Sequence, residues 1–259
     1  MTRAPELHIF TDASELAAEA ADFFLWVGEQ AIAQRGRFLV ALSGGSTPKA
    51  LYSELAGPAC ASRLDWSRVH FCFGDERCVP PSHAESNFAA AQSTLFAPLG
   101  IPPDHIYRLE GEADPAEAAR RYEETLRRLT GTLQGQWPQF DLILLGMGED
   151  GHTASLFPGT PALHERERWV VPGQAPHGIR SRLTLTPGVI NHAGVVLFLV
   201  TGASKAAVLR DVVEGRESAR APYPAAMIRP AVGRLVWFLD RAAASELTVS
   251  KQGISSEEA

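Results

Sequence analysis

Cysteine is scarce in this sequence, and the three that occur, Cys60, Cys72 and Cys78, form no C-x-x-C pair. A disulfide framework or a thiolate metal site is therefore not expected, and a reducing cytoplasm is the simplest location. The chain also lacks any apolar run near the roughly 18 residues of a membrane span, and its start lacks the pattern of an export signal. We therefore predict a cytoplasmic protein without a membrane partner.

Clustered positive charge is absent as well. The 24 Lys and Arg residues are scattered and outnumbered by 30 Asp and Glu residues, for a net charge of -6. Nucleic-acid-binding proteins need clustered cations to neutralise phosphates, so no nucleic-acid partner is expected. No G-x-S-x-G elbow and no metal-ligand spacing of His, Asp and Glu is present, which disfavours a serine hydrolase and a metal site. The sequence gives no indication of protein partners.

The segments that are present alternate between strands and helices. Apolar runs rich in β-branched and aromatic residues predict strands at 37–42, 68–73, 140–145, 194–200 and 234–239. The runs at 140–145 and 194–200 are apolar almost throughout, as expected for parallel strands covered by helices on both faces. Helical patterns occupy 14–33, 48–56, 85–95, 115–129 and 204–213. This alternation predicts a doubly wound α/β fold with a largely parallel central sheet.

Helix ends, domain limits and loops leave weaker signals in the sequence than the strands and helices themselves. The first helix is expected to begin after Asp12, with Glu15 completing a capping box, and to stop near Gly36. No internal repeat or linker is evident, so we predict a single α/β domain over residues 1–248. The Pro- and Gly-bearing stretch 172–182 is predicted to be a surface loop, and the polar tail 249–259 to be disordered.

Ligands bind beyond the carboxyl ends of strands in open α/β sheets, so the segments that follow the predicted strands are the places to search. After the first strand comes a Gly-rich turn, with Pro48 suited to the first position of the next helix. Its backbone N–H groups, hydroxyls and helix dipole suit a phosphate, although a plain tight turn is the alternative. The predicted phosphate-binding residues are Ser43, Gly44, Gly45, Ser46 and Thr47.

Two further segments offer charged residues after a strand. Asp75 and Arg77 stand in the stretch 74–77, where a solvated loop with a local ion pair is the favoured interpretation for the residues alone. Arg77 gains weight because a planar guanidinium complements phosphate or carboxylate oxygens. Lys205 falls in the first turn of a predicted helix, where a cation opposes the helix dipole. A bound anion would compensate, and a solvated lysine is an equally good explanation.

The remaining segment, 146–152, carries the strongest chemical signal. Gly146, Gly148 and Gly151 satisfy G-x-G-x-x-G, but no acid ends a predicted strand about 20 residues later, so a dinucleotide site is rejected. That interpretation would also leave Asp150 and His152 unexplained. A histidine titrates near neutrality, and a nearby carboxylate orients its ring. The pair therefore suits general acid–base catalysis, whereas the other seven histidines are predicted to be structural.

Taken together, these segments resemble the glucosamine-6-phosphate deaminase/6-phosphogluconolactonase family, and within it the lactonases. The resemblance extends over most of the chain. The motifs that carry it are SGGSTP at 43–48, GDERCVP at 74–80 with Ser86 and Asn87 downstream, GMGEDGHTASLFP at 146–158, RLTLT at 182–186 with Asn191, and TGASK at 201–205.

The resemblance implies a modified Rossmann-like sheet and an enzyme of the oxidative pentose phosphate pathway. Such an enzyme hydrolyses a small-molecule phosphosugar lactone, 6-phospho-D-glucono-1,5-lactone, to 6-phosphogluconate without a metal or organic cofactor. His152 would take a proton from the attacking water and return it to the ring oxygen, while Asp150 orients the imidazole. The 43–47 turn, Arg77, Lys205 and Arg182 would hold the phosphate and stabilise negative charge. Asp75 is expected among the substrate-binding residues.

Two alternatives remain open. In the related deaminases a glutamate follows the catalytic histidine by five positions, and here that position is Phe157, which cannot pair with a histidine as a carboxylate does. Asp75 could still serve as the base of an amino-sugar phosphate deaminase or isomerase. A non-catalytic sugar-phosphate sensor would normally carry a helix-turn-helix, for which residues 1–10 leave no room. Of the three candidate functions, we rank the sensor below the lactonase and the deaminase or isomerase.

Overall fold

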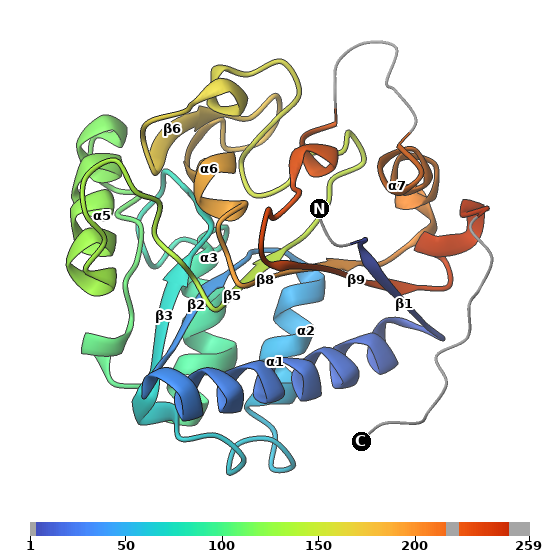
Figure 1. The fold of residues 1–259 in the computed structure, drawn as a ribbon, viewed down its shortest axis with the longest axis horizontal. Coiled ribbons are helices and arrows are strands. Elements are labelled where there is room, and N and C mark those ends of the chain that lie inside the picture. Colours follow the sequence, from blue (N-terminus) through green and yellow to red (C-terminus); the bar gives the residue numbers. More distant parts are fainter. Residues whose placement is uncertain (1–3, 216–222, 249–259) are drawn as a thin grey trace.

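A six-stranded parallel sheet forms the centre of the computed structural model, which describes residues 4–215 and 223–248. Its strands run in the order β1-β9-β8-β5-β2-β3 (Figure 1). Their bounds are β1 Glu6–Phe10, β2 Phe38–Leu42, β3 Val69–Phe73, β5 Leu142–Leu145, β8 Val195–Val200 and β9 Arg234–Asp240. The tail 249–259 lies outside the described residues, and the single domain over 1–248 stays a prediction.

Helices cover both faces of this sheet, as predicted. Figure 1 shows α1 and α2 together on one face and α6 on the other. The helices are α1 Ala13–Arg35, α2 Ser46–Leu55, α3 Asn87–Ala91, α4 Ala97–Leu99, α5 Pro115–Thr130, α6 Pro187–Ile190 and α7 Ala206–Val213, with a π-helical turn, η2, at Gln92–Phe96. Short 3-10 turns are η1 Trp66–Arg68, η3 Pro103–His105, η4 Pro161–His164, η5 Ala203–Lys205, η6 Pro224–Met227 and η7 Ala243–Glu246. No helix within 4–215 or 223–248 is long and apolar enough to cross a membrane.

The first helix shows how closely its ends follow the sequence. Asp12 caps α1 by accepting hydrogen bonds from the N–H groups of Ser14 (2.9 Å) and Glu15 (3.0 Å). Glu15 reaches back, as expected of a capping box, but its carboxylate accepts from the N–H of Thr11 (2.5 Å) and not from that of Asp12. Gly36 ends the helix in the left-handed region with φ of 74°.

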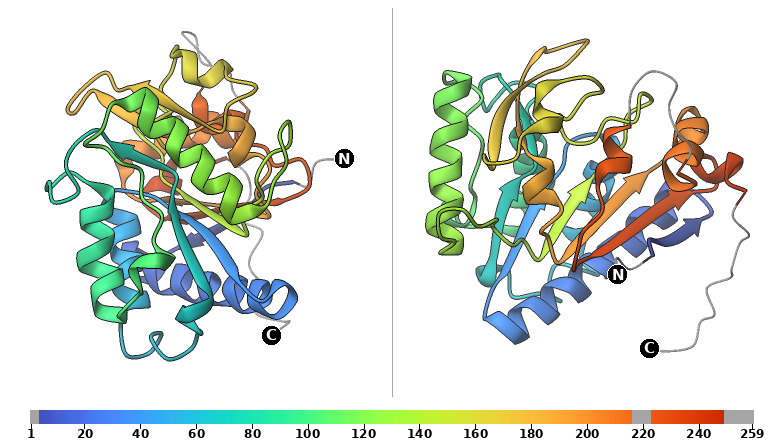
Figure 2. Two further views of the ribbon diagram at one scale, coloured as in Figure 1. Left: turned by 90° about the vertical axis from the view of Figure 1, so that its left-hand side faces the viewer. Right: turned by 45° about the horizontal axis from the view of Figure 1, so that its top comes forward.

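A second, antiparallel sheet was not predicted. It consists of β4 Asp75–Arg77, β7 Ser181–Leu185 and β6 Val170–Gln174, in that order, and Figure 2 shows β6 lying apart from the central sheet, beside α5. Two predictions are therefore wrong: the charged stretch after β3 is a strand, and 172–182 is a hairpin whose ends belong to β6 and β7. These strands are short and mix polar with apolar residues, so pairing and not local pattern defines them. Strand β1 was missed for the same reason.

The central strands bury nearly every side chain, which places the chemistry at their ends. All five residues of β2, all four of β5 and all six of β8 are buried, as parallel strands covered on both faces require. Because neighbouring strands are parallel, the segments that follow β2, β3, β5 and β8 leave the sheet at one edge. The sequence segments singled out for their chemistry are therefore neighbours in space.

Candidate active site

A cleft of about 300 Å³ opens at this edge of the sheet. Residues from all four predicted segments line it. The lining residues are Ser43, Gly44, Gly45, Ser46, Thr47, Pro48, Asp75, Arg77, Asn87, Gly146, Met147, Gly148, His152, Ala154, Leu199, Val200, Thr201 and Lys205. Among the predicted site residues, only Asp150 and Arg182 do not line the cleft. Asp150 contacts His152, and Arg182 lies opposite Arg77 in the β4–β7 pair, so each has a neighbour that lines the cleft.

The Gly-rich turn leads directly into α2. Gly45 caps that helix with φ of 105°, a conformation that favours glycine. Pro48 was predicted to be the first residue of this helix, but it is the third residue of α2. A proline is accommodated there because the N–H groups of the first turn have no partner within the helix. The hydroxyl of buried Tyr52 fixes the start of the turn: it accepts from the N–H of Ser43 (3.0 Å) and donates to its carbonyl (2.6 Å).

Gly44 is explained by a neighbour that the sequence analysis did not place in the site. A Cβ at position 44 would overlap the amide of Asn87, which lines the cleft from the start of α3. Gly44 therefore allows Asn87 to approach the turn. The residues around Asn87 in the sequence do not indicate this contact, and Asn87 was named only as part of the family motifs. Met147, Ala154, Leu199 and Val200 are further lining residues that were not predicted.

Asp75 lies at the inner wall of the cleft and is only 7% exposed. Its carboxylate accepts hydrogen bonds from the Ser155 hydroxyl (2.6 Å) and from the Asn87 side-chain amide (3.1 Å). Asn87 Nδ2 also donates to the Asp75 carbonyl (2.9 Å). Asp75 is thus held by fixed partners and is not a residue of a solvated loop, which corrects the interpretation favoured from the residues alone.

Glu76 points away from the cleft and ties β4 to α3. Its carboxylate accepts from the N–H groups of Arg77 (2.8 Å), Asn87 (2.7 Å) and Phe88 (2.9 Å) and from the Ser86 hydroxyl (2.9 Å). Burial raises the pKa of the Glu76 carboxyl, and these four hydrogen bonds oppose that rise. The side chain therefore serves to set the position of Arg77 and Asn87 on either side of it.

The turn after β5 brings the predicted acid–base pair together. Asp150 Oδ1 lies 2.5 Å from His152 Nδ1 and accepts from the His152 backbone N–H (3.1 Å). Burial alone would raise the pKa of the Asp150 carboxyl, but the hydrogen bonds and the charge of His152 outweigh it and lower that pKa. The Phe157 ring packs on the imidazole with centroids 4.4 Å apart. A Cβ at Gly148 would overlap the imidazole, so only glycine fits at that position.

Three cations surround the cleft in different ways. Lys205, in the 3-10 turn that precedes α7, lies 3.5 Å from Glu149 through its Nζ. Arg77 donates from Nη1 to the Glu85 carbonyl (2.5 Å) and stands directly opposite Arg182 across the β4–β7 pair. Burial and the charge of Arg77 lower the pKa of Arg182, whose Nε is buried without a partner among the described residues. Like charges in register destabilise a strand pair unless an anion lies nearby.

Comparison with known proteins decides the family. The model of the family described as glucosamine-6-phosphate isomerases/6-phosphogluconolactonase matches residues 11–237. The chain belongs to this family. It is 40% identical over 244 residues to a Nostoc protein named 6-phosphogluconolactonase, and the alignment covers 94% of this chain and 98% of that protein. A human protein of the same name is 42% identical over 252 residues and covers 94% of both chains.

Solved structures of the isomerase/lactonase family agree with this fold. The structure of 6-phosphogluconolactonase from Trypanosoma cruzi matches with a TM-score of 0.84 and 32% identity, over 96% of this chain and 98% of that one. A monomeric glucosamine-6-phosphate deaminase matches with a TM-score of 0.76 and 23% identity, which shows a shared fold alone.

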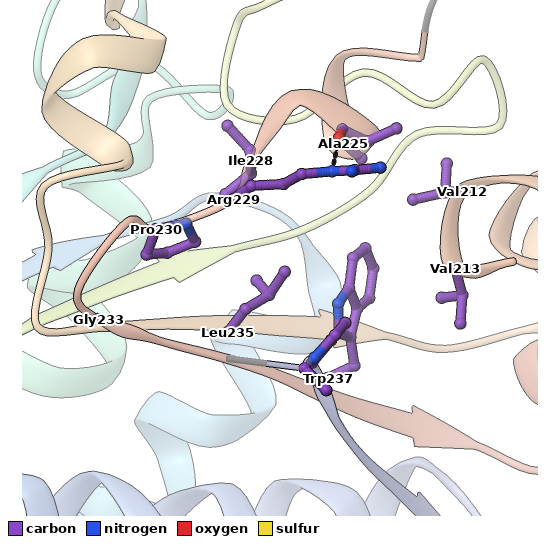
Figure 3. A pocket seen from close by; sticks show the side chains of 12 residues that line it. Val212, Val213, Ala225, Ile228, Arg229, Pro230, Gly233, Leu235 and Trp237 are labelled. Carbon is purple, nitrogen blue, oxygen red and sulfur yellow. Dashed lines mark hydrogen bonds between the residues drawn. The ribbon is translucent and has the colours of Figure 1, made fainter. Parts of the chain in front are cut away.

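A second pocket, of about 270 Å³, lies away from the cleft beside His152, between α7, η6 and β9 (Figure 3). Its lining is mostly apolar, and among the described residues that line it Arg229 carries the only charge. Figure 3 shows that side chain extending across the pocket, with its Nε donating to the Ala226 carbonyl (3.1 Å). The pocket offers no acid–base pair, so the cleft beside His152 is the candidate active site.

Proposed function

We propose that this protein hydrolyses 6-phospho-D-glucono-1,5-lactone to 6-phosphogluconate, the lactonase step of the oxidative pentose phosphate pathway. The single observation that carries the proposal is the His152–Asp150 pair at 2.5 Å, set in a cleft that also presents Arg77 and Lys205. The relatives that carry the lactonase name support the choice of substrate. A cytoplasmic location and catalysis without a metal or organic cofactor belong to the same proposal.

His152 would act as the general acid and base. With Nδ1 hydrogen-bonded to the Asp150 carboxylate, the imidazole carries its proton on Nδ1 and leaves Nε2 free to accept one. Nε2 removes a proton from water as the water oxygen attacks the lactone carbonyl carbon. The tetrahedral intermediate then collapses, the bond from that carbon to the ring oxygen breaks, and the imidazolium returns the proton to that oxygen. Asp150 would orient the ring through its contact with Nδ1.

The cationic side of the cleft would hold the phosphate and the developing negative charge. The turn from Ser43 to Thr47 places hydroxyls and the N-terminus of α2 beside Lys205, and this combination favours an anion. Arg77, backed by Arg182 across the strand pair, adds further positive charge. These donors match the acceptor oxygens of a phosphate monoester and of an oxyanion.

A deaminase or isomerase is the second candidate, and Asp75 is the observation that favours it, because this carboxylate lines the same cleft. Against it stands Phe157, whose ring packs on His152 in the place of the carboxylate that related deaminases use. A sugar-phosphate sensor would use the cleft without turnover.

The test is a direct assay with freshly made lactone, following acid release above the uncatalysed rate. His152→Ala should lower kcat by about 10²- to 10⁴-fold, the usual contribution of a general acid–base residue. His164→Ala, at an exposed histidine outside the cleft, is the matched control and should stay near wild type. Near-normal turnover by His152→Ala would overturn the assigned role. Ammonia release from glucosamine 6-phosphate, with no lactone hydrolysis, would overturn the function.

A further inference from the structure

The cleft offers many hydrogen-bond donors and few carbonyl or carboxylate acceptors. A phosphate and a lactone carbonyl only accept hydrogen bonds, so cations, hydroxyls and backbone N–H groups satisfy them. The hydroxyls of a sugar ring also donate, and a donor needs an acceptor. Among the described side chains that line the cleft, only Asp75 and Asn87 present a carbonyl or carboxylate oxygen. Hydroxyl oxygens can also accept, but Asp75 and Asn87 offer acceptor oxygens that carry no hydrogen of their own, which suits these two to recognise ring hydroxyls.

The orientation of Asn87 is fixed by its partners. The residue is 3% exposed, and its Nδ2 donates both to the Asp75 carbonyl (2.9 Å) and to Asp75 Oδ1 (3.1 Å). Because both partners are acceptors, the nitrogen and oxygen of the amide cannot be exchanged. Oδ1 accepts no hydrogen bond from any residue in 4–215 or 223–248. The Asn87 amide is therefore held in one orientation by its nitrogen, while its oxygen has no partner among the described residues.

The surroundings of Asn87 hold this oxygen at the cleft. Gly44 lies against the amide, and any side chain there would overlap Oδ1. The Asn87 backbone N–H is anchored on Glu76 (2.7 Å), and Asp75 is itself held by the Ser155 hydroxyl (2.6 Å). Asn87 Oδ1 is not shut off from solvent, and its residue lines the cleft. Water can therefore pair with it in the free protein, and a donor group on a bound ligand can take the place of that water.

We infer that Asn87 is a specificity-determining residue: its Oδ1 accepts a hydrogen bond from a ring hydroxyl of the substrate, and Asp75 is the positioning residue that holds the amide. This inference rests on the proposed function and narrows it. The site selects phosphosugar lactones that keep that hydroxyl and rejects lactones that lack it, because the bound analogue leaves the Asn87 oxygen unpaired.

The experiment compares the parent lactone with three analogues that each lack one ring hydroxyl, at C2, C3 or C4. For the wild type, one analogue should show a kcat/KM lower than the parent by about 10- to 100-fold, the effect of losing one hydrogen bond to an acceptor that the bound substrate covers. Asn87→Leu keeps the number and branching of the side-chain heavy atoms and removes the Oδ1 acceptor, together with the Nδ2 donor to Asp75. It should lose a similar factor on the parent and almost nothing on that one analogue.

Asn191→Leu is the matched control. The Asn191 amide bonds only protein groups, the Met227 carbonyl (3.1 Å) and the Arg229 N–H (2.6 Å), and its loss should lower stability without changing the ratio between parent and analogue. If Asn87→Leu lowers kcat/KM by one factor on all four lactones, Asn87 is merely structural and the inference is wrong. If the wild type hydrolyses all three analogues as well as the parent, it is refuted without any variant. No activity on the parent would overturn the proposed function together with it.

Discussion

Two buried tyrosines bracket strand ends in the same way and offer a paired test of the architecture behind the cleft. The Tyr52 hydroxyl bridges the N–H and carbonyl of Ser43, just beyond β2. The Tyr122 hydroxyl accepts from the N–H of Phe73 (2.8 Å) and lies 3.2 Å from its carbonyl, at the end of β3. Replacing either tyrosine with phenylalanine removes one oxygen and leaves the N–H and carbonyl of Ser43 or Phe73 without that partner. The Tyr122 hydroxyl also lies 3.3 Å from the Tyr107 carbonyl.

The expected cost differs between the two sites. A buried backbone group without a partner destabilises by about 1–3 kcal/mol. Phe73 is 1% exposed and does not line the cleft, so both of its groups stay dry and Tyr122→Phe should cost about 2–6 kcal/mol. Ser43 lines the cleft, where water can replace part of the loss, so Tyr52→Phe should cost about 1–3 kcal/mol.

Equilibrium urea unfolding of the two variants and the wild type measures these costs, and lactone kinetics supply the second readout. Tyr52→Phe should raise KM at modest stability loss, because Ser43 opens the turn predicted to hold the phosphate. Tyr122→Phe should lose more stability with a smaller change in KM. A larger stability loss in Tyr52→Phe, or an unchanged KM in that variant, would refute the reasoning.

Three further predictions concern the turn after β5. Gly148→Ala should lower kcat about 10²-fold, because its methyl group would displace the His152 imidazole; Gly146→Ala, which meets no described atom within 4 Å, should lower it less. The pKa of Asp150 lies below its ordinary 3.8, so the stability from its contact with His152 should be complete above about pH 4 and lost as the pH falls through the lowered pKa; unfolding of wild type and Asp150→Asn across this range would detect it, and equal pH slopes would contradict it. Phe157→Leu should lower kcat several-fold with little change in KM, since the ring packs on His152 without lining the cleft; a rise in KM alone would argue against a positioning role.

The parts of the site that could be predicted from the sequence are those that depend on parallel strands. A buried strand such as Leu142–Leu145 can be recognised because all its residues are apolar. Ligands bind beyond the carboxyl ends of parallel strands, so turns that are distant in the sequence can be predicted to form one site. Strand β4 escaped prediction because its register with β7 joins residues about a hundred positions apart, as in the pair Arg77 and Arg182. Asn87 escaped because its role depends on Gly44 making room for it, which is a property of the packed structure.

The order of strands in the central sheet also bears on how the protein is made. Among the strands within residues 4–215 and 223–248, β1 comes first and pairs with β9 alone, which is the last of these strands in chain order (Figure 1). During synthesis β1 therefore has no strand partner until β9 has left the ribosome, and β8 meanwhile presents an open edge that can pair wrongly. Strand β9 pairs with both β8 and β1, so it closes that edge and fixes the N-terminal strand in one step. A chain cut short before β9 should thus be a substrate for chaperones and proteases, even though every cleft residue has already been made.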